Sequence, residues 1–112
     1  MQNTGEVLHK LMEVISQRRD APTSESYTCR LFEGGIARIG GKVTEEAAEV
    51  VEAAEEPGDE GRAHLIREAA DVVYHLLVLL AARDADLADV EAELARRFGI
   101  SGLEEKASRE RP

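Results

Sequence analysis

Cysteine, tryptophan and long apolar runs are scarce or missing in this 112-residue sequence. The single cysteine, Cys29, cannot form a disulfide within the chain, and a thiolate zinc site needs several cysteines. The longest apolar stretch, residues 76–82, is far shorter than the roughly 20 residues that span a bilayer. Basic residues number 14 against 23 acidic ones, a formal charge of −9, so nucleic acid is not an expected partner, because phosphate contacts need a basic face. The first residues carry neither a basic start nor an apolar stretch, so we expect no signal peptide and a cytoplasmic protein without membrane contacts.

The residue pattern predicts one all-α domain over residues 1–112. Aromatic residues make up 4%, alanine is frequent, and β-branched residues do not alternate with polar ones, so helix is favoured over strand. We expect a helical bundle of four to five helices, followed by a frayed, charged tail over residues 100–112. The expected helices cover residues 4–18, 27–32 (closed by Gly34-Gly35), 36–55 (continuous through Gly40-Gly41) and 63–83, and a last one starts at residues 84–86.

Dimerisation is expected to complete this bundle. With so few large side chains, the core of a monomer would be thin, and small domains bury only about 60–70% of their unfolded surface. The segment 63–83 is apolar on nearly every face, which one small bundle can hardly cover. We therefore expect this helix to be central and to lie at a subunit interface.

Five of the acidic residues stand out because of their spacing. Glu46 and Glu49 are three residues apart, as are Glu68 and Asp71, so each pair shares one face of a helix, and Glu45 precedes the first pair. The first pair is expected at the edge of an apolar stripe, from which its carboxylates can turn inward. That stripe consists of Val43, Ala47, Val50 and Ala54.

The second pair is harder to explain as ordinary solvated acids, because its helix has little other polar surface and burying a lone carboxylate is expensive. A divalent cation between the two helices would stabilise both pairs, and oxygen ligands without sulfur favour Mg²⁺ or Mn²⁺ over zinc. Such a site would bind a polyphosphate through the metal, which reconciles a charge of −9 with an anionic substrate. The alternative is that the acids are merely solvated, since E-x-x-E is common on surface helices of acidic chains.

Single residues near these acids have two interpretations each. Lys42 lies three and four residues before Glu45 and Glu46, where it either forms a salt bridge or contacts a phosphate. His75, one turn after Asp71, either donates a hydrogen bond to that carboxylate or is a buried histidine satisfied by a neighbour. The remaining histidines, His9 and His64, belong to no recognisable constellation.

Four stretches carry a resemblance to a known family over about residues 24–97. They are Ser26-Tyr27-Thr28, Lys42 with Glu45-Glu46-x-x-Glu49-Val50, Glu68-Ala69-Ala70-Asp71, and Tyr74-His75-Leu76-Leu77-Val78-Leu79-Leu80. The acidic core alone resembles the wider all-α nucleotide pyrophosphohydrolase superfamily, which includes MazG-like enzymes and dimeric dUTPases. With the S-Y-T segment and the Y-H-x-x-V-L-L run, the sequence resembles the phosphoribosyl-ATP pyrophosphatases.

This resemblance implies Mg²⁺-dependent hydrolysis of phosphoribosyl-ATP to phosphoribosyl-AMP and pyrophosphate, the second step of histidine biosynthesis, by water attack on the α–β phosphoanhydride. It also implies an α-helical homodimer. Glu45 would orient water or pair with Lys42. The metal ligands it implies are Glu46, Glu49, Glu68 and Asp71, and the candidate substrate contacts are Lys42, Tyr27 and Arg38.

Two other functions compete with this one. A house-cleaning (d)NTP pyrophosphohydrolase would share the metal site but differ in its base pocket, whereas a helical interaction module would have only solvated acids. Tyr27 and Thr28 are equally explained by packing and helix capping, and Arg38 by the surface. Pyrophosphate release from phosphoribosyl-ATP, measured against a panel of dNTPs, separates the three hypotheses.

Overall fold

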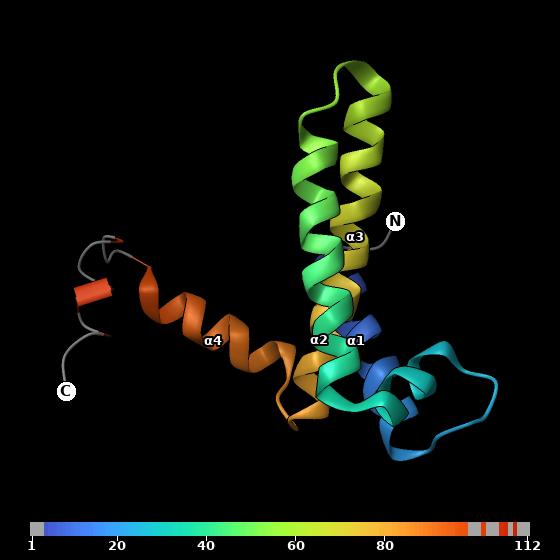
Figure 1. Cartoon of the computed structure of the whole chain (residues 1–112). Coiled ribbons are helices and arrows are strands. Elements are labelled where there is room, and N and C mark those ends of the chain that lie inside the picture. The colour runs from blue at the N-terminus through green and yellow to red at the C-terminus, as the bar shows by residue number, and fades with distance from the viewer. Residues whose placement is uncertain (1–3, 99–101, 103–105, 108, 110–112) are drawn as a thin grey trace.

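The computed structural model describes residues 4–98, 102, 106–107 and 109, and the regular elements that it forms there are all helices (Figure 1). Its helices are α1 (Thr4–Asp20), α2 (Tyr27–Ala54), α3 (Gly58–Ala82) and α4 (Leu87–Arg97). No strand occurs among the described residues, so the all-α prediction is confirmed. The expected tail over residues 100–112 falls mostly outside the described residues. No helix within the described ranges has the length and apolar character needed to cross a bilayer.

Helix α2 is kinked near its beginning. Ser26 caps it, since its hydroxyl accepts a hydrogen bond from the Cys29 backbone N–H (3.3 Å). Gly35 interrupts the helical geometry with φ 73° and ψ −173°, a conformation that glycine alone adopts readily because it has no Cβ. The predicted short helix closed by Gly34-Gly35 is therefore confirmed. Beyond the kink, α2 continues through Gly40-Gly41 as expected.

A long antiparallel hairpin of α2 and α3 dominates the fold (Figure 1). At its turn, Gly61 packs so closely that a Cβ there would lie 2.2 Å from the Glu56 carbonyl oxygen. Helix α3 begins at Gly58, five residues before the predicted start. The sequence pattern did not predict a helix here because Gly58 and Gly61 have low helix propensity. The helix nevertheless begins at Gly58, where Asp59 and Glu60 interact favourably with the positive end of the helix dipole.

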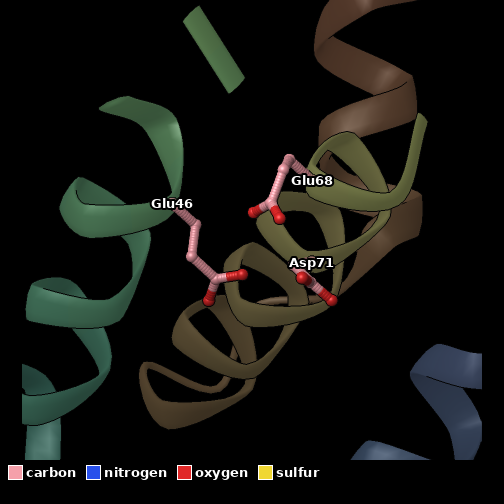
Figure 2. Close-up of side chains that lie close together, drawn as sticks. All are labelled: Glu46, Glu68 and Asp71. Carbon is pink, nitrogen blue, oxygen red and sulfur yellow. The ribbon is translucent and has the colours of Figure 1, made fainter. Parts of the chain in front are cut away.

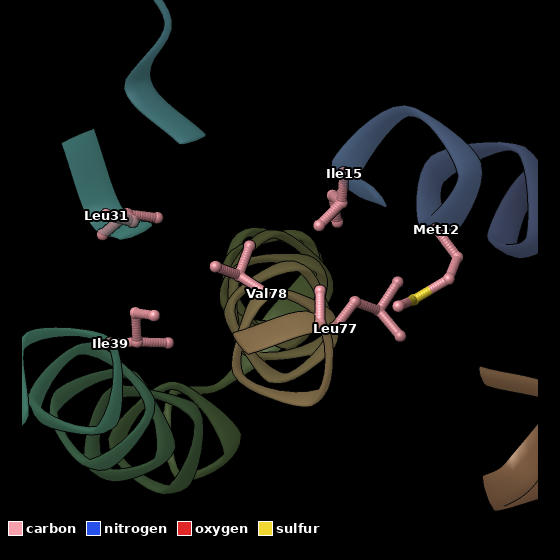
Figure 3. Close-up of a cluster of buried hydrophobic side chains, with 7 residues drawn as sticks. Met12, Ile15, Leu31, Ile39, Leu77 and Val78 are labelled. Atoms are coloured by element: carbon pink, nitrogen blue, oxygen red, sulfur yellow. The ribbon is translucent and has the colours of Figure 1, made fainter. Parts of the chain in front are cut away.

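The hydrophobic core lies at the end of the hairpin remote from its turn, where α1 packs against it. Helix α3 runs between α1 and the kinked part of α2, and Figure 3 shows core side chains converging on it from both sides. This is the central place that its apolar sequence predicts. The buried core residues are Met12, Ile15, Leu31, Ile39, Leu77, Val78 and Ala81.

The half of the hairpin near its turn lies beyond α1, and α4 projects away from it (Figure 1). This half exposes large apolar side chains such as Val51 and Ile66. Within α4, Leu94 is also exposed, and Phe98, which caps the end of this helix, is 81% exposed. The described part of one chain therefore leaves much apolar surface in contact with water.

Candidate metal centre

Glu46 occupies the inward face of α2, in the place of a core residue. The buried residues of α2 beyond the kink are Ile39, Glu46 and Ala53, each seven residues after the last. Ala47 and Ala54 of the predicted stripe are exposed, so the prediction that Glu46 lies at the edge of the buried face was wrong. A spacing of seven follows the 3.5-residue period of two helices packed along their length.

Three carboxylates from the two helices of the hairpin form a cluster. Glu46 points from α2 towards Glu68 and Asp71 of α3 (Figure 2). One oxygen from each residue lies within 4.8 Å of the others. Glu46 is buried, Glu68 half-buried and Asp71 exposed, so the cluster opens to solvent on the Asp71 side. The structure thus brings Glu46 of the first pair next to both residues of the second pair, the arrangement on which the hypothesis of a shared cation site depends.

Glu49 adds a fourth carboxyl beside the cluster. A hydrogen bond with Glu68 raises the pKa of Glu49, and burial and the neighbouring acids raise it further. Burial also raises the pKa of Glu46, as do the charges of Asp71 and Glu68, while His75 and Lys42 lower it. The acids of this site therefore repel one another, and a proton or a cation relieves the repulsion.

The donor set fits a hard divalent cation. Glu68 Oε2 is buried and has no hydrogen-bond partner within the described part of the chain. An unsatisfied buried carboxylate oxygen is costly unless a cation or a proton neutralises it. Carboxylate oxygens without sulfur or nitrogen ligands are typical of Mg²⁺ and Mn²⁺ sites. Glu46, Glu68 and Asp71 could therefore hold such an ion, with Glu49 next to them.

His75 contacts the Glu46 carboxylate from α3. Its Nδ1 is 2.5 Å from Glu46 Oε1 and 2.9 Å from the backbone carbonyl oxygen of Asp71. Of the two interpretations of His75, the structure therefore supports the buried histidine satisfied by its neighbours, since Nδ1 contacts Glu46 and the Asp71 carbonyl rather than the Asp71 carboxylate. Because His75 follows Asp71 by one helical turn, its imidazole lies next to the backbone carbonyl of Asp71. The Glu46 carboxylate contacts the same ring nitrogen from the facing helix α2.

His64 supports the other end of the cluster, contrary to the expectation that it lacks a constellation. Its Nε2 lies 3.3 Å from Glu68 Oε1, and its Nδ1 lies 3.0 Å from Glu56 in the turn. The hydrogen bond with Glu56 raises the pKa of His64. The spacing of four residues between His64 and Glu68 could have indicated one contact, but Glu56 comes close only through the turn. Among the described residues, His9 pairs with Glu91 on the surface (2.8 Å).

The first turn of α2 meets α3 through two tyrosines. The Tyr27 hydroxyl lies 2.9 Å from His75 Nε2, and its ring stacks on Tyr74 with the centroids 6.3 Å apart. The Tyr74 hydroxyl bonds to Thr28, which is buried. Tyr27 is thus connected through His75 to Glu46, a link that the sequence did not predict. The kink at Gly35 separates this first turn from the part of α2 that carries Glu46.

The other candidate substrate contacts lie outside the cluster. Lys42 Nζ is 3.7 Å from Glu45 Oε2, and the side chains of Lys42 and Glu45 are 40% and 57% exposed. Arg38 is exposed and lies across Gly34, where an added Cβ would come within 2.2 Å of its Cδ. The long distance and the exposure leave Lys42 free to turn away from Glu45, so its two interpretations stay open.

Comparison with known proteins identifies the family. The phosphoribosyl-ATP pyrophosphohydrolase family matches residues 8–98. The phosphoribosyl-ATP pyrophosphatase of Rhodopirellula baltica is 51% identical over 102 residues, which cover 91% of this chain and 85% of that protein. Its counterpart in Paracoccus denitrificans is 53% identical over 91% of this chain and 92% of its own, and that of Dechloromonas aromatica is 45% identical over 96% of both. The chain belongs to the phosphoribosyl-ATP pyrophosphohydrolase family.

Proposed function

We propose that this protein hydrolyses phosphoribosyl-ATP to phosphoribosyl-AMP and pyrophosphate, the second step of histidine biosynthesis, in the cytoplasm. The observation that carries the proposal is the carboxylate cluster of Glu46, Glu68 and Asp71 in a chain of this family. The relatives at about half identity are named for the same reaction. Fold alone would not support this assignment, because one fold hosts many reactions, but the cluster supplies the chemistry that the reaction needs.

Glu46, Glu49, Glu68 and Asp71 would hold Mg²⁺, or Mn²⁺ in its place. When bound, the ion neutralises charge on the phosphate oxygens and orients water. The support for this ligand set is the orphaned Glu68 Oε2, the 4.8 Å cluster and the hydrogen bond between Glu49 and Glu68. A cation held by acids also allows a chain with a charge of −9 to bind a polyphosphate.

The remaining residues would bind and orient the substrate. Water attacks one phosphorus of the α–β phosphoanhydride, the bridging oxygen leaves with the other phosphorus, and the water proton is released. Glu45, exposed and one residue before Glu46, orients this water by accepting its hydrogen bond. Lys42 turns from Glu45 to a phosphate oxygen, and Tyr27 and Arg38 contact the rest of the nucleotide.

A homodimer would complete the bundle around this site. The half of the hairpin near its turn has no third helix over it among the described residues, and α4 exposes an apolar side. Two helices alone bury too little apolar surface to be stable in water. A symmetric contact between two copies of the chain would bury the exposed apolar side chains of both copies. The exposed apolar side chains available for it include Val51, Ile66, Val73, Leu76, Leu94 and Phe98.

The test is pyrophosphate release by the purified protein with phosphoribosyl-ATP and with a panel of dNTPs, each with Mg²⁺ and with EDTA. We expect Mg²⁺-dependent release from phosphoribosyl-ATP, and loss of that release in Asp71→Asn. Release from dNTPs alone would support the house-cleaning enzyme, and release from no nucleotide would support the interaction module. Sedimentation as a monomer at micromolar concentration would overturn the dimer.

A further inference from the structure

A chain of hydrogen bonds leads to the Glu46 carboxylate from two residues outside the cluster, Tyr27 and His75. It runs from the Tyr27 hydroxyl to His75 Nε2 (2.9 Å), through the imidazole ring, and from His75 Nδ1 to Glu46 Oε1 (2.5 Å). The side chains of His75 and Glu46 are 8% and 9% exposed, so water does not compete for this contact.

The surroundings of His75 determine which atoms donate. Its Nδ1 faces two acceptors, the Glu46 carboxylate and the Asp71 carbonyl, so this nitrogen carries a hydrogen and donates it. In the neutral imidazole, Nε2 then accepts the hydrogen bond that the Tyr27 hydroxyl donates. The hydrogen on Nδ1 therefore points towards the Glu46 carboxylate whether the ring is neutral or protonated, and Nε2 bonds to the Tyr27 hydroxyl.

We infer that His75 and Tyr27 are positioning residues for the cation site: His75 fixes the Glu46 carboxylate towards Glu68 and Asp71, and Tyr27 fixes the imidazole. This inference rests on the proposed function only in that the cluster binds a divalent cation. Residues that hydrogen-bond to metal ligands set the orientation of those ligands, and their loss typically weakens metal binding by about 10- to 100-fold.

The kink of α2 is what allows Tyr27 to take part. Tyr27 and Glu46 belong to the same helix, yet both contact His75 of α3, one on each ring nitrogen. The stack of the Tyr27 ring on the Tyr74 ring holds the first turn of α2 in this place. Tyr27 itself remains 47% exposed, so its hydroxyl can be removed with little disturbance of packing.

The experiment measures Mn²⁺ affinity without substrate, from the electron paramagnetic resonance signal of free Mn²⁺. His75→Leu should weaken Mn²⁺ binding by roughly 10-fold or more. His75→Asn should retain much of the wild-type affinity, because its amide N–H can take the place of Nδ1, whereas His75→Gln places its amide near Nε2 and should resemble His75→Leu. The control is His9→Asn, which removes a surface imidazole paired with Glu91 and should bind Mn²⁺ as the wild type does.

Tyr27→Phe tests the second link. It should weaken Mn²⁺ binding by about 3-fold, within the range for one neutral hydrogen bond, and should have no further effect once His75→Asn has removed its acceptor. Tyr74→Phe is the matched control: it should lower thermal stability and leave Mn²⁺ affinity unchanged, because the Tyr74 hydroxyl bonds to Thr28.

Equal losses in Asn, Gln and Leu variants of His75, or affinities that merely follow melting temperature, would overturn the inference. So would a Tyr74→Phe loss equal to that of Tyr27→Phe. Because no nucleotide is present, the result is independent of which substrate the enzyme hydrolyses. Tight Mn²⁺ binding with the predicted ranking would stand even if phosphoribosyl-ATP were not the substrate.

Discussion

Glu46→Gln should stabilise the metal-free protein while removing its response to Mg²⁺. The amide keeps the shape of the side chain, and its oxygen can still accept the hydrogen bond from His75 Nδ1. The change therefore removes one negative charge and little else. It does so at a buried position where the charges of Asp71 and Glu68, together with burial, raise the pKa of the native carboxyl.

The size of the effect follows from the geometry. Two unit charges 4.8 Å apart repel by about 0.9 kcal/mol in water and about 3.5 kcal/mol at an effective dielectric constant of 20. Glu46 has two such neighbours, but His75 and Lys42 offset part of the repulsion, and solvent screens the exposed Asp71. We expect a net gain of about 1–2 kcal/mol. For a chain of this length, that gain raises the melting temperature by about 4–8 °C.

Thermal unfolding followed by circular dichroism, at one fixed protein concentration, measures both halves of the prediction. In EDTA near neutral pH, the variant should melt above the wild type. Excess Mg²⁺ at about 100 times its dissociation constant should stabilise the wild type by about 2.7 kcal/mol and the variant far less. Phosphoribosyl-ATP hydrolysis by the variant should fall by at least about 10-fold.

The control is Glu93→Gln on α4. The Glu93 carboxylate accepts hydrogen bonds from Arg96 and Arg97, which lower its pKa to about 2. Its neutralisation should lower stability slightly in EDTA and leave the Mg²⁺ response unchanged. If Glu46→Gln also melted below the wild type and kept the full Mg²⁺ response, Glu46 would be no more than the ion-pair partner of His75, and the metal assignment would fail.

Four further predictions concern the acids, the kink at Gly35 and Lys42. Glu49→Gln and Asp71→Asn should each abolish most hydrolysis and raise the metal-free melting temperature; near-normal turnover in saturating Mg²⁺ would contradict the ligand set. Because the pKa values of Glu46 and Glu49 are raised in the folded state, that state binds more protons than the unfolded chain; metal-free stability should therefore increase as the pH falls from neutrality towards the ordinary glutamate pKa of about 4.3, as melting curves would show. Gly35→Ala should cost about 1–2 kcal/mol, because alanine is strained at positive φ, and a wild-type melting temperature would refute this. Lys42→Met should lower kcat/KM by about 10-fold or more at nearly unchanged stability, since an exposed pair contributes only about 0.3–0.5 kcal/mol; wild-type kinetics would leave Lys42 as a surface residue.

The sequence predicted the helices and the acidic cluster because both depend on local spacing. Residues three apart share a helix face, so Glu68 and Asp71 had to project together, and glycine at residues 34–35 indicated a break. The inward face of α2 was not predictable in the same way. Alanine is small enough to lie on either side of a helix, and only the packing of α3 made Glu46, rather than Ala47, the buried residue.

The spacing of residues along the sequence also could not predict contacts between distant segments. The Tyr27–His75 hydrogen bond depends on the direction that the chain takes at Gly35, and the His64–Glu56 contact depends on the turn of the hairpin. Each is set by a few backbone dihedral angles, which residue spacing does not specify. The sequence did place His75 near Asp71, but the facing helix, and therefore its partner Glu46, could be identified only from the fold.

The position of the cluster in the hairpin connects its chemistry to its stability. Its acids lie between the core, which includes Ile39 and Val78, and the half of the hairpin that α1 does not cover. The core holds the two helices together on one side of the site, so the carboxylates are kept close despite their repulsion. On the other side, few apolar contacts within the described chain oppose that repulsion. A cation that neutralised the cluster would therefore stabilise the part of the hairpin that the core does not reach, and the binding energy of the ion would contribute directly to folding. Under the proposed function, the acids that bind a polyphosphate through a cation would, for the same electrostatic reason, make the stability of the folded state depend on that cation.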